Sequence, residues 1–203
     1  MVIQAASPCA TSWLAQELLG LKSLTICLNL RSRHPVGSAM PSNFTLCLLW
    51  RNMSNITVRQ AILSDIEALA PLFDGYRQFY GRPSDIPATR EFLLARFNHG
   101  ESVLFIAHEG ITPVGFTQLY PSFSSVSLAR VFVLNDLFVH EQSRRKGVAS
   151  KLISAATEFA KSLGAVRVSL STATTNQTAQ ALYQSAGWKR DEQFFVYHFA
   201  IQA

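Results

Sequence analysis

The sequence predicts an α/β (α+β) protein in which a mixed, mostly antiparallel central sheet is flanked by helices. Two patterns support this: strand-like runs recur along the last three quarters of the chain, and helical segments alternate with strands towards its end. The composition agrees, because 203 residues that are 48% hydrophobic and 15% charged can bury a sizeable core. This composition excludes a disordered chain and a disulfide-stabilised miniprotein.

The first elements of the expected fold are one strand and two helices. Residues 56–62 alternate apolar and polar side chains, as a half-buried strand does. Ser64 and Glu67 have the spacing of a capping box and are expected to open the first helix. A second helix is expected over residues 89–98, ended by Gly100, a residue type that tolerates positive φ.

Strands dominate the next part of the chain. Residues 103–108 and 114–120 are expected to form two strands around a turn at Glu109-Gly110. Residues 130–139 are apolar on both faces, which predicts a central strand. The remaining expected elements are a helix over 147–163, a strand over 166–171, a short helix over 178–185 and a closing strand over 194–201.

Residues 1–52 differ in composition from the rest of the chain. They hold all three cysteines but only one of the 14 phenylalanines, and they carry a net charge of +3 out of the total of +5. No basic residue precedes Lys22, which argues against a secretory signal, and Glu17 and Lys22 interrupt the apolar stretch that a membrane span would need. The cysteine spacing matches no zinc pattern.

We therefore predict two parts, an N-terminal extension over 1–52 and one domain over 53–203. The extension is expected to be disordered or an artefact of the start site, with translation beginning naturally at Met53. A transit or regulatory tail and a true structural element stay open as alternatives.

The strongest chemical signal lies where the central strand meets the following helix. Three consecutive cations, Arg144, Arg145 and Lys146, precede Gly147, which lets the backbone approach a ligand. The helix that begins there offers free N–H groups and a positive dipole end, as pyrophosphate sites do. A basic loop that only caps the helix is the alternative, since the spacing is neither the dinucleotide fingerprint nor a P-loop.

Two motifs resemble those of the GCN5-related N-acetyltransferases (GNAT). Arg144-x-x-Gly147-x-Ala149 is similar to the Arg/Gln-x-x-Gly-x-Gly/Ala signature of that family. The segment from Asn176 to Trp188 resembles its Asn-x-x-Ala-x-x-Leu-Tyr-x-x-x-Gly-Phe/Trp segment. The resemblance covers residues 55–201 and none of 1–52.

The resemblance implies the GNAT fold, with acetyl-CoA bound between two splayed parallel strands, here 130–139 and 165–171. The backbone of Phe138 and Val139 would pair with the pantetheine amides in the manner of an added strand, and Asn176 would hydrogen-bond the pantetheine arm. The pyrophosphate would be held by the amides and cations of Arg144, Arg145, Lys146, Gly147, Val148, Ala149 and Ser150. No metal is expected.

The chemistry of acetyl transfer requires a base and an acid. An alkylamine is protonated at neutral pH and must lose a proton before it attacks the thioester, and the departing thiolate benefits from a general acid. Tyr183 matches the family position of the acid; a core aromatic is the alternative. Asp136, a carboxylate in an apolar strand, is expected to be the base, with Glu141 acting through water as a second candidate and His140 as a third. An Asp136 that only bonds local backbone at a bulge remains open.

The acceptor is expected to be a small primary amine or a polyamine-like molecule. Asn135 to Val139 is similar to the Glu-Asp-Phe-Phe-Val stretch of spermidine/spermine acetyltransferases, but Asn135 stands where those enzymes have the first acid. Tyr76 and Tyr80 would place aromatic groups near the acceptor. A protein lysine or N-terminal amine, and a non-catalytic acyl-CoA-binding regulatory module, are the alternatives.

The remaining expectations concern partners and location. A net charge of +2 over residues 53–203 argues against nucleic acid, and no segment indicates a membrane partner. The family often dimerises, so a homodimer stays open. A glycosylation sequon falls on Asn176 itself, and with unpaired cysteines and no signal peptide this predicts a cytoplasmic protein.

Overall fold

The computed structural model describes residues 55–201, so the predictions about 1–52 lie outside the described residues. The elements are β1 (Ile56–Gln60), a 3₁₀ turn (Leu63–Asp65), α2 (Ile66–Phe79), α3 (Ile86–Asn98), β2 (Val103–Glu109), β3 (Thr112–Ser124), β4 (Ala129–Val139), a second 3₁₀ turn (Glu141–Ser143), α4 (Val148–Ser162), β5 (Arg167–Ser169) and α5 (Gln177–Ser185). Within residues 55–201 no helix has both the length and the apolar composition needed to cross a bilayer.

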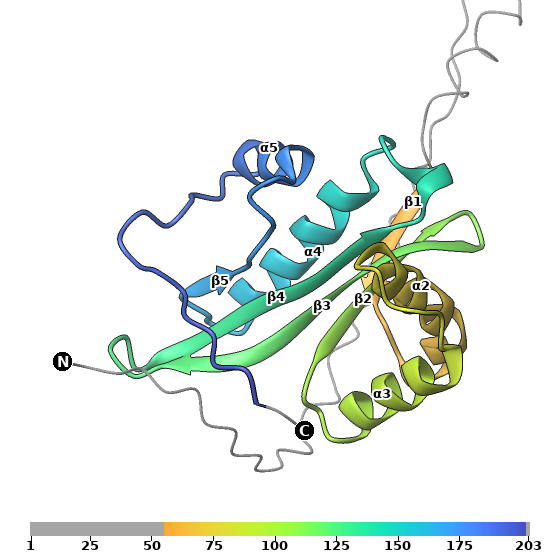
Figure 1. Ribbon diagram of the computed structural model, residues 1–203, viewed down its shortest axis with the longest axis horizontal. Helices are drawn as coiled ribbons and strands as arrows, with labels where there is room; N and C mark the ends of the chain where they lie inside the picture. The colour runs from red at the N-terminus through yellow and green to blue at the C-terminus, as the bar shows by residue number, and fades with distance from the viewer. Residues whose placement is uncertain (1–54, 202–203) are drawn as a thin grey trace, which may run out of the picture. The chain divides into compact units, whose positions relative to one another are not determined.

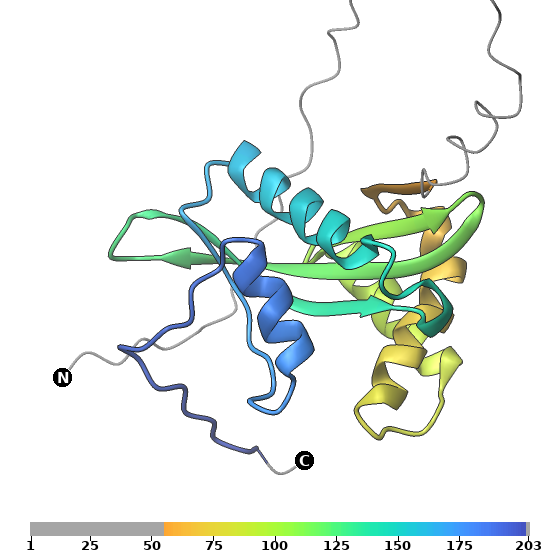
Figure 2. The same cartoon turned by 90° about the horizontal axis from the view of Figure 1, so that it is seen from above.

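The five strands form one mixed sheet in the order β1-β2-β3-β4-β5 (Figure 1). Neighbouring strands are antiparallel except for β4 and β5, which run parallel. Helix α4 covers one face of the sheet, and α2 and α3 cover the other (Figure 2). The predicted α/β fold class, with a mostly antiparallel sheet and flanking helices, is confirmed.

Two apolar cores hold these layers together, one on each face of the sheet. In α4, Val148, Leu152 and Ala156 recur every fourth residue and pack against one face. On the other face, Leu69 and Phe73 of α2 pack against the strands. Full burial of a Val, Leu or Phe side chain stabilises the fold by about 1.5–3 kcal/mol. Burial of these side chains therefore holds the helices on both faces of the sheet.

A β-bulge in β4 changes which face its side chains point to. Leu119 of β3 pairs with Leu134, whereas Gln118 pairs with Asp136, so Asn135 has no partner in β3. As a result Leu134 packs in the core beside α4, while Phe138, four residues later, packs against the core beside α2. Bulges commonly re-aim side chains in this way near functional sites.

The predicted capping box at the start of the first helix is wrong. A 3₁₀ turn precedes α2, and the side chain of Asp65, not Ser64, accepts the hydrogen bond from the amide of Ile62 at 2.8 Å. Arg59 donates to the same carboxylate at 2.6 and 2.8 Å. Asp65 can accept from backbone and guanidinium at once, which a serine hydroxyl cannot match.

The predicted closing strand over 194–201 is also wrong. The segment has no regular structure, and its side chains from Phe194 to Ile201 that are large and apolar are 72–92% exposed. Its β-branched and aromatic residues favour a strand, but strand propensity reports how well a side chain packs on a pleated surface. In the described residues no strand pairs with this segment.

Candidate functional site

The parallel pair at the edge of the sheet separates after a short contact. Residues Val131 to Val133 of β4 pair with Arg167 to Ser169 of β5. Strand β4 then continues to Val139 beyond the end of β5, as Figure 1 shows. The backbone of residues 134–139 therefore has no β5 partner on that side, and an extended ligand could pair with it as an added strand.

A wide cleft of about 1540 Å³ lies on the β5 side of this opening. It is lined by β4 at Val133, by β5 and the residues after it, and by α5. Tyr183 and Trp188 contribute aromatic walls, with their ring centroids 5.9 Å apart. The end of α4 and residues 188–198 complete its lining, and from β4 it includes Val133 alone.

The loop after β4 leads directly into the N-terminus of α4. Gly147 has φ +80° at the N-cap position, and no side chain caps the helix. Arg145 also lies in the left-handed region, with φ +61°, which is uncommon for a residue other than glycine. The free amide groups and the dipole of α4 make this turn suitable for an anion.

The three predicted phosphate-binding cations have different partners. Arg144 donates from Nε to the carbonyl of Val139 at 3.0 Å and lies 3.7 Å from Glu141. Lys146 lies 2.8 and 2.9 Å from the two carboxylate oxygens of Glu109. Within the described residues Arg145 makes no ion pair, so its guanidinium stays available to a ligand.

Asp136 is 3% exposed and lies in β4 directly after the bulge. Its Oδ1 accepts a hydrogen bond from the side chain of Asn135 at 3.1 Å, and among the described residues Oδ2 has no partner. Burial raises the pKa of this carboxyl group, outweighing the opposite influence of the nearby Asn135 and Tyr76 side chains. The expected bulge is present, but the carboxylate does not bond local backbone there.

Two tyrosines lie beside Asp136. Burial raises the pKa of Tyr76, and the Asp136 charge adds to that increase. Burial, and then Asp136, raise the pKa of Tyr120 to about 12. Both phenols therefore stay protonated at neutral pH and can donate hydrogen bonds.

The second predicted motif places Tyr183 on α5 and Asn176 at the N-cap position directly before it. Burial, and then the neighbouring Tyr80, raise the pKa of Tyr183, which keeps this phenol protonated. Asn176 caps the helix, its side-chain oxygen accepting from the amide of Ala179 at 3.1 Å. An amide side chain donates as well as accepts, so this cap leaves it able to bind a ligand.

The alternative bases lie outside the core of the protein. Glu141 and His140 are both exposed at the start of the loop between β4 and α4 (residues 140–147), whereas Asp136 is buried. Within residues 55–201 no three His, Cys, Asp or Glu side chains gather as metal ligands.

Sequence reasoning missed Glu109, Ser143 and Tyr120. The sequence predicts Glu109 only as a turn residue, yet from the β2–β3 hairpin it contacts Ser143 and Lys146 in the loop before α4. Nothing in the spacing of the sequence connects it with residues 34 and 37 positions later. Tyr120 was expected in a strand, but its position beside Asp136 depends on the register at the bulge.

Comparison with known proteins connects this geometry to a family. Residues 69–188 match the sequence profile of the Acetyltransferase (GNAT) family. The uncharacterized N-acetyltransferase YhfO of Bacillus subtilis is 45% identical over 148 residues, which are 73% of this chain and 99% of that protein.

Solved structures agree with this match. The crystal structure of a probable acetyltransferase is 43% identical, has a TM-score of 0.69, and covers 72% of this chain and 99% of its own. AAC(6')-Iy, solved with the bisubstrate analogue CoA-S-monomethyl-acetylneamine, is 22% identical with a TM-score of 0.61 over 73% of this chain and all of its own. At that identity the likeness concerns the fold alone.

Proposed function

The chain belongs to the acetyltransferase (GNAT) family and is an acetyl-CoA-dependent N-acetyltransferase, and from this premise we propose that it acetylates the primary amine of a small molecule. The observation that carries the proposal is the buried Asp136 carboxylate, which has one unpartnered oxygen and lies in the unpaired part of β4. A buried charge of this kind is costly and is typical of a functional site.

Acetyl-CoA supplies an activated acetyl group as a thioester. We propose that the amides and Arg145 of the phosphate loop hold its pyrophosphate, and that the backbone of Phe138 and Val139 and the side chain of Asn176 hold its pantetheine arm. The amide of Val139 would donate to the carbonyl oxygen as negative charge develops there. The similarly folded AAC(6')-Iy was solved with a bisubstrate analogue that contains CoA, which supports a fold able to accommodate CoA.

Asp136 is the proposed base. Its raised pKa brings it closer to the range in which a carboxylate accepts a proton efficiently, and the same carboxylate can hold the ammonium form of the acceptor. Glu141 is exposed and its carboxylate lies 3.7 Å from the guanidinium of Arg144, whereas Asp136 is buried in the unpaired part of β4. For this reason we favour Asp136 over a water relay from Glu141.

Tyr183 is the proposed acid to the departing thiolate. Its pKa is raised, so it carries its proton at neutral pH, and it lines the cleft beside β5. Proton donation to the sulfur would prevent the reverse attack by the thiolate.

Two acids that could have served a polyamine are already paired within the protein, which favours an acceptor with a single cationic group. Asp74 is buried and accepts from Gln78, Ser84, Arg77 and the amide of Asp85. Glu101 forms an ion pair with Arg96. Since these acids are already satisfied, a polyamine would find few carboxylates for its further charges. A protein lysine or N-terminal amine remains the second candidate acceptor.

The test offers the purified full-length chain acetyl-CoA and a panel of acceptors, with free thiol release as the signal. The panel contains primary monoamines, spermidine, amino acids and lysine peptides. We expect thiol release with monoamines. Binding of CoA without turnover of any acceptor would instead identify a non-catalytic acyl-CoA-binding module, and preferential turnover of lysine peptides would identify the protein acceptor.

A further inference from the structure

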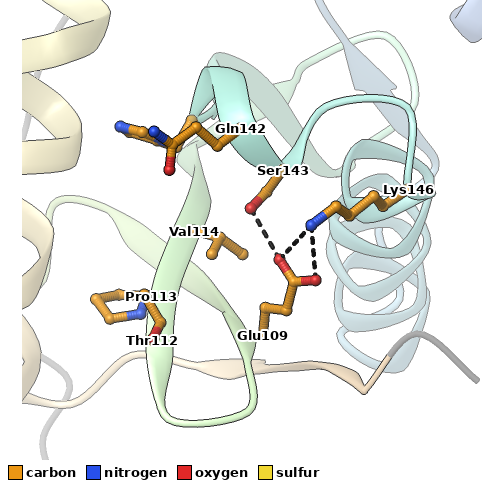
Figure 3. Close-up of a pocket in the computed structure, with 8 residues that line it drawn as sticks. Glu109, Thr112, Pro113, Val114, Gln142, Ser143 and Lys146 are labelled. Atoms are coloured by element: carbon orange, nitrogen blue, oxygen red, sulfur yellow. Dashed lines mark hydrogen bonds and ion pairs between the residues drawn. The ribbon is translucent and has the colours of Figure 1, made fainter.

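Glu109 joins the β2–β3 hairpin to the phosphate loop, residues 140–147. Its carboxylate accepts a hydrogen bond from the hydroxyl of Ser143 at 2.9 Å and two contacts from Lys146 Nζ at 2.8 and 2.9 Å. Figure 3 shows both side chains pointing from the loop towards this carboxylate, beside a cavity of about 330 Å³. We call these three residues the Glu109 clamp.

Glu109 itself is held in place by the sheet. The backbone of Glu109 pairs with Ile56 of β1 and with Thr112 of β3, so both neighbouring strands hold it. Lys146 and Ser143 lower the pKa of the Glu109 carboxyl group, which therefore stays charged at neutral pH. On the loop side, Ser143 is 4% exposed and cannot move freely.

The clamp spans the strained part of the loop. Arg145 lies between Ser143 and Lys146 and has φ +61°. A residue other than glycine keeps such a conformation only where surrounding contacts determine it. Glu109 holds the loop on both sides of Arg145, so its contacts with Ser143 and Lys146 can stabilise the positive φ of Arg145.

We propose that Glu109 is a positioning residue for cofactor binding and that Lys146 shapes the phosphate loop through Glu109 instead of contacting phosphate itself. This inference rests on the proposed binding of acetyl-CoA at the loop. The amine of Lys146 already contacts both oxygens of a carboxylate, so it would have to share or leave this partner in order to bind a phosphate. The ligand-facing cation of the loop is then Arg145.

The two roles of Lys146 predict opposite effects of Glu109→Gln. If the clamp positions the loop, losing the charge weakens CoA binding by about three- to tenfold, the cost of ordering one or two side chains on binding. If Lys146 binds phosphate directly, the same substitution releases its amine and leaves CoA affinity unchanged or tighter. Calorimetric titration with CoA, which needs no acceptor, measures whether the substitution weakens or strengthens CoA binding.

Two further variants test whether the clamp acts as a unit. Lys146→Met is expected to weaken CoA binding to the same degree as Glu109→Gln, and the double variant no more than either single one. Ser143→Ala, which removes no charge, is expected to weaken binding in the same direction. If the losses of CoA affinity in the two single variants add up in the double variant, Glu109 and Lys146 act independently, and the proposal that they act as a unit is overturned.

The matched control is Glu158→Gln, which removes the carboxylate of an exposed ion pair with Lys161 at 2.7 Å on α4, outside the phosphate loop. It is expected to leave CoA affinity unchanged. A second readout uses S-acetylpantetheine, which lacks the pyrophosphate: Glu109→Gln should lower kcat/KM for acetyl-CoA but not for this analogue. An equal loss for both donors would indicate general damage and overturn the positioning role.

The outcomes also separate this inference from the proposed function. If the wild-type chain does not bind CoA, the proposed function fails and the clamp fails with it. If the wild-type chain binds CoA and Glu109→Gln binds it equally well, only the clamp is overturned.

Discussion

Asp136 is an acid in surroundings that disfavour its charge. It is buried in β4, one of its oxygens has no partner among the described residues, and its pKa is raised by burial. A buried polar atom without a partner costs about 1–3 kcal/mol. The folded state thus binds a proton at Asp136 more readily than the unfolded chain does, so the stability contributed by this group falls as pH rises from the ordinary carboxyl pKa through the raised one.

Asp136→Asn should therefore separate activity from stability. We expect kcat to fall by about 10²–10⁴-fold, the usual contribution of a general base. Above the raised pKa the free energy of unfolding should be unchanged or higher, because the variant no longer buries a charge. The measurements are a pH profile of kcat and urea unfolding at pH 8.

The acid limb of the wild-type profile, where activity is lost as pH falls through the Asp136 pKa, should be absent from the variant. Glu141→Gln is the matched comparison and should retain this limb. If Glu141→Gln loses it and Asp136→Asn keeps it, the water relay through Glu141 is the base.

Tyr183→Phe should lower turnover more than cofactor affinity. Removing the phenol proton is expected to reduce kcat by about 10²-fold, while the ring still packs against Trp188. KM for acetyl-CoA should then change little. Steady-state kinetics measures both, with Tyr197→Phe, an exposed tyrosine, as control. Equal losses in kcat and in acetyl-CoA affinity would assign Tyr183 a packing role.

Single residues differ in how well the sequence predicts their surroundings. Asp136 stands out because a carboxylate interrupts an apolar strand, and Gly147 because its position between strand and helix requires positive φ. The unpartnered oxygen of Asp136 and the contacts of Glu109 depend on strand register and hairpin position. Those are set by tertiary packing, which no local pattern reports.

At the scale of elements, Gly115 allows β3 and β4 to approach closely where the proposed thioester site lies. It pairs with Val139, and a Cβ placed on it would lie 2.7 Å from the carbonyl oxygen of Phe138. Real Cβ atoms do not come so near a backbone oxygen, so a side chain here must displace one strand. The position of the unpaired end of β4 therefore depends on this glycine.

Gly115→Ala is expected to destabilise the protein by about 1–3 kcal/mol, as overpacking does. It should also lower kcat/KM, because the displaced atoms belong to Phe138 and Val139. Urea unfolding and steady-state kinetics measure the two effects. Thr112→Ala, an exposed change on the same strand, should stay within about 0.5 kcal/mol of wild type. A Gly115→Ala variant as stable and active as this control would show that β3 adjusts without moving β4.

Elements with a strong local pattern were predicted well. The alternation of β1, the β-branched run of β4 and the four-residue period of α4 all agree with the structure, with ends within a few residues. The failures have a common cause: the start of α2 depends on Arg59 meeting Asp65, and a strand over 194–201 needs a neighbour to pair with. Local propensity specifies neither partner.

At the scale of the whole molecule, the described residues contain every feature on which the proposed function depends. The sheet, both apolar cores and the proposed site lie in residues 55–201. The Bacillus subtilis relative is covered over 99% of its length by 148 residues, which leave about a quarter of this chain without a counterpart. We therefore propose that catalysis does not require residues 1–52, which carry +3 of the net charge of +5.

A chain consisting of residues 53–203 should fold and work by itself. We expect its Tm to lie within about 2–4 °C of the full-length chain, the shift that 1 kcal/mol produces in a domain of this size. Its kcat/KM for acetyl-CoA should agree within about twofold, since no residue of the proposed site is removed. Calorimetric melting and thiol-release kinetics on both chains make the comparison. A chain over 53–203 that melts many degrees lower would show that 1–52 is a structural element, whereas equal melting with lost activity would show that it regulates the site.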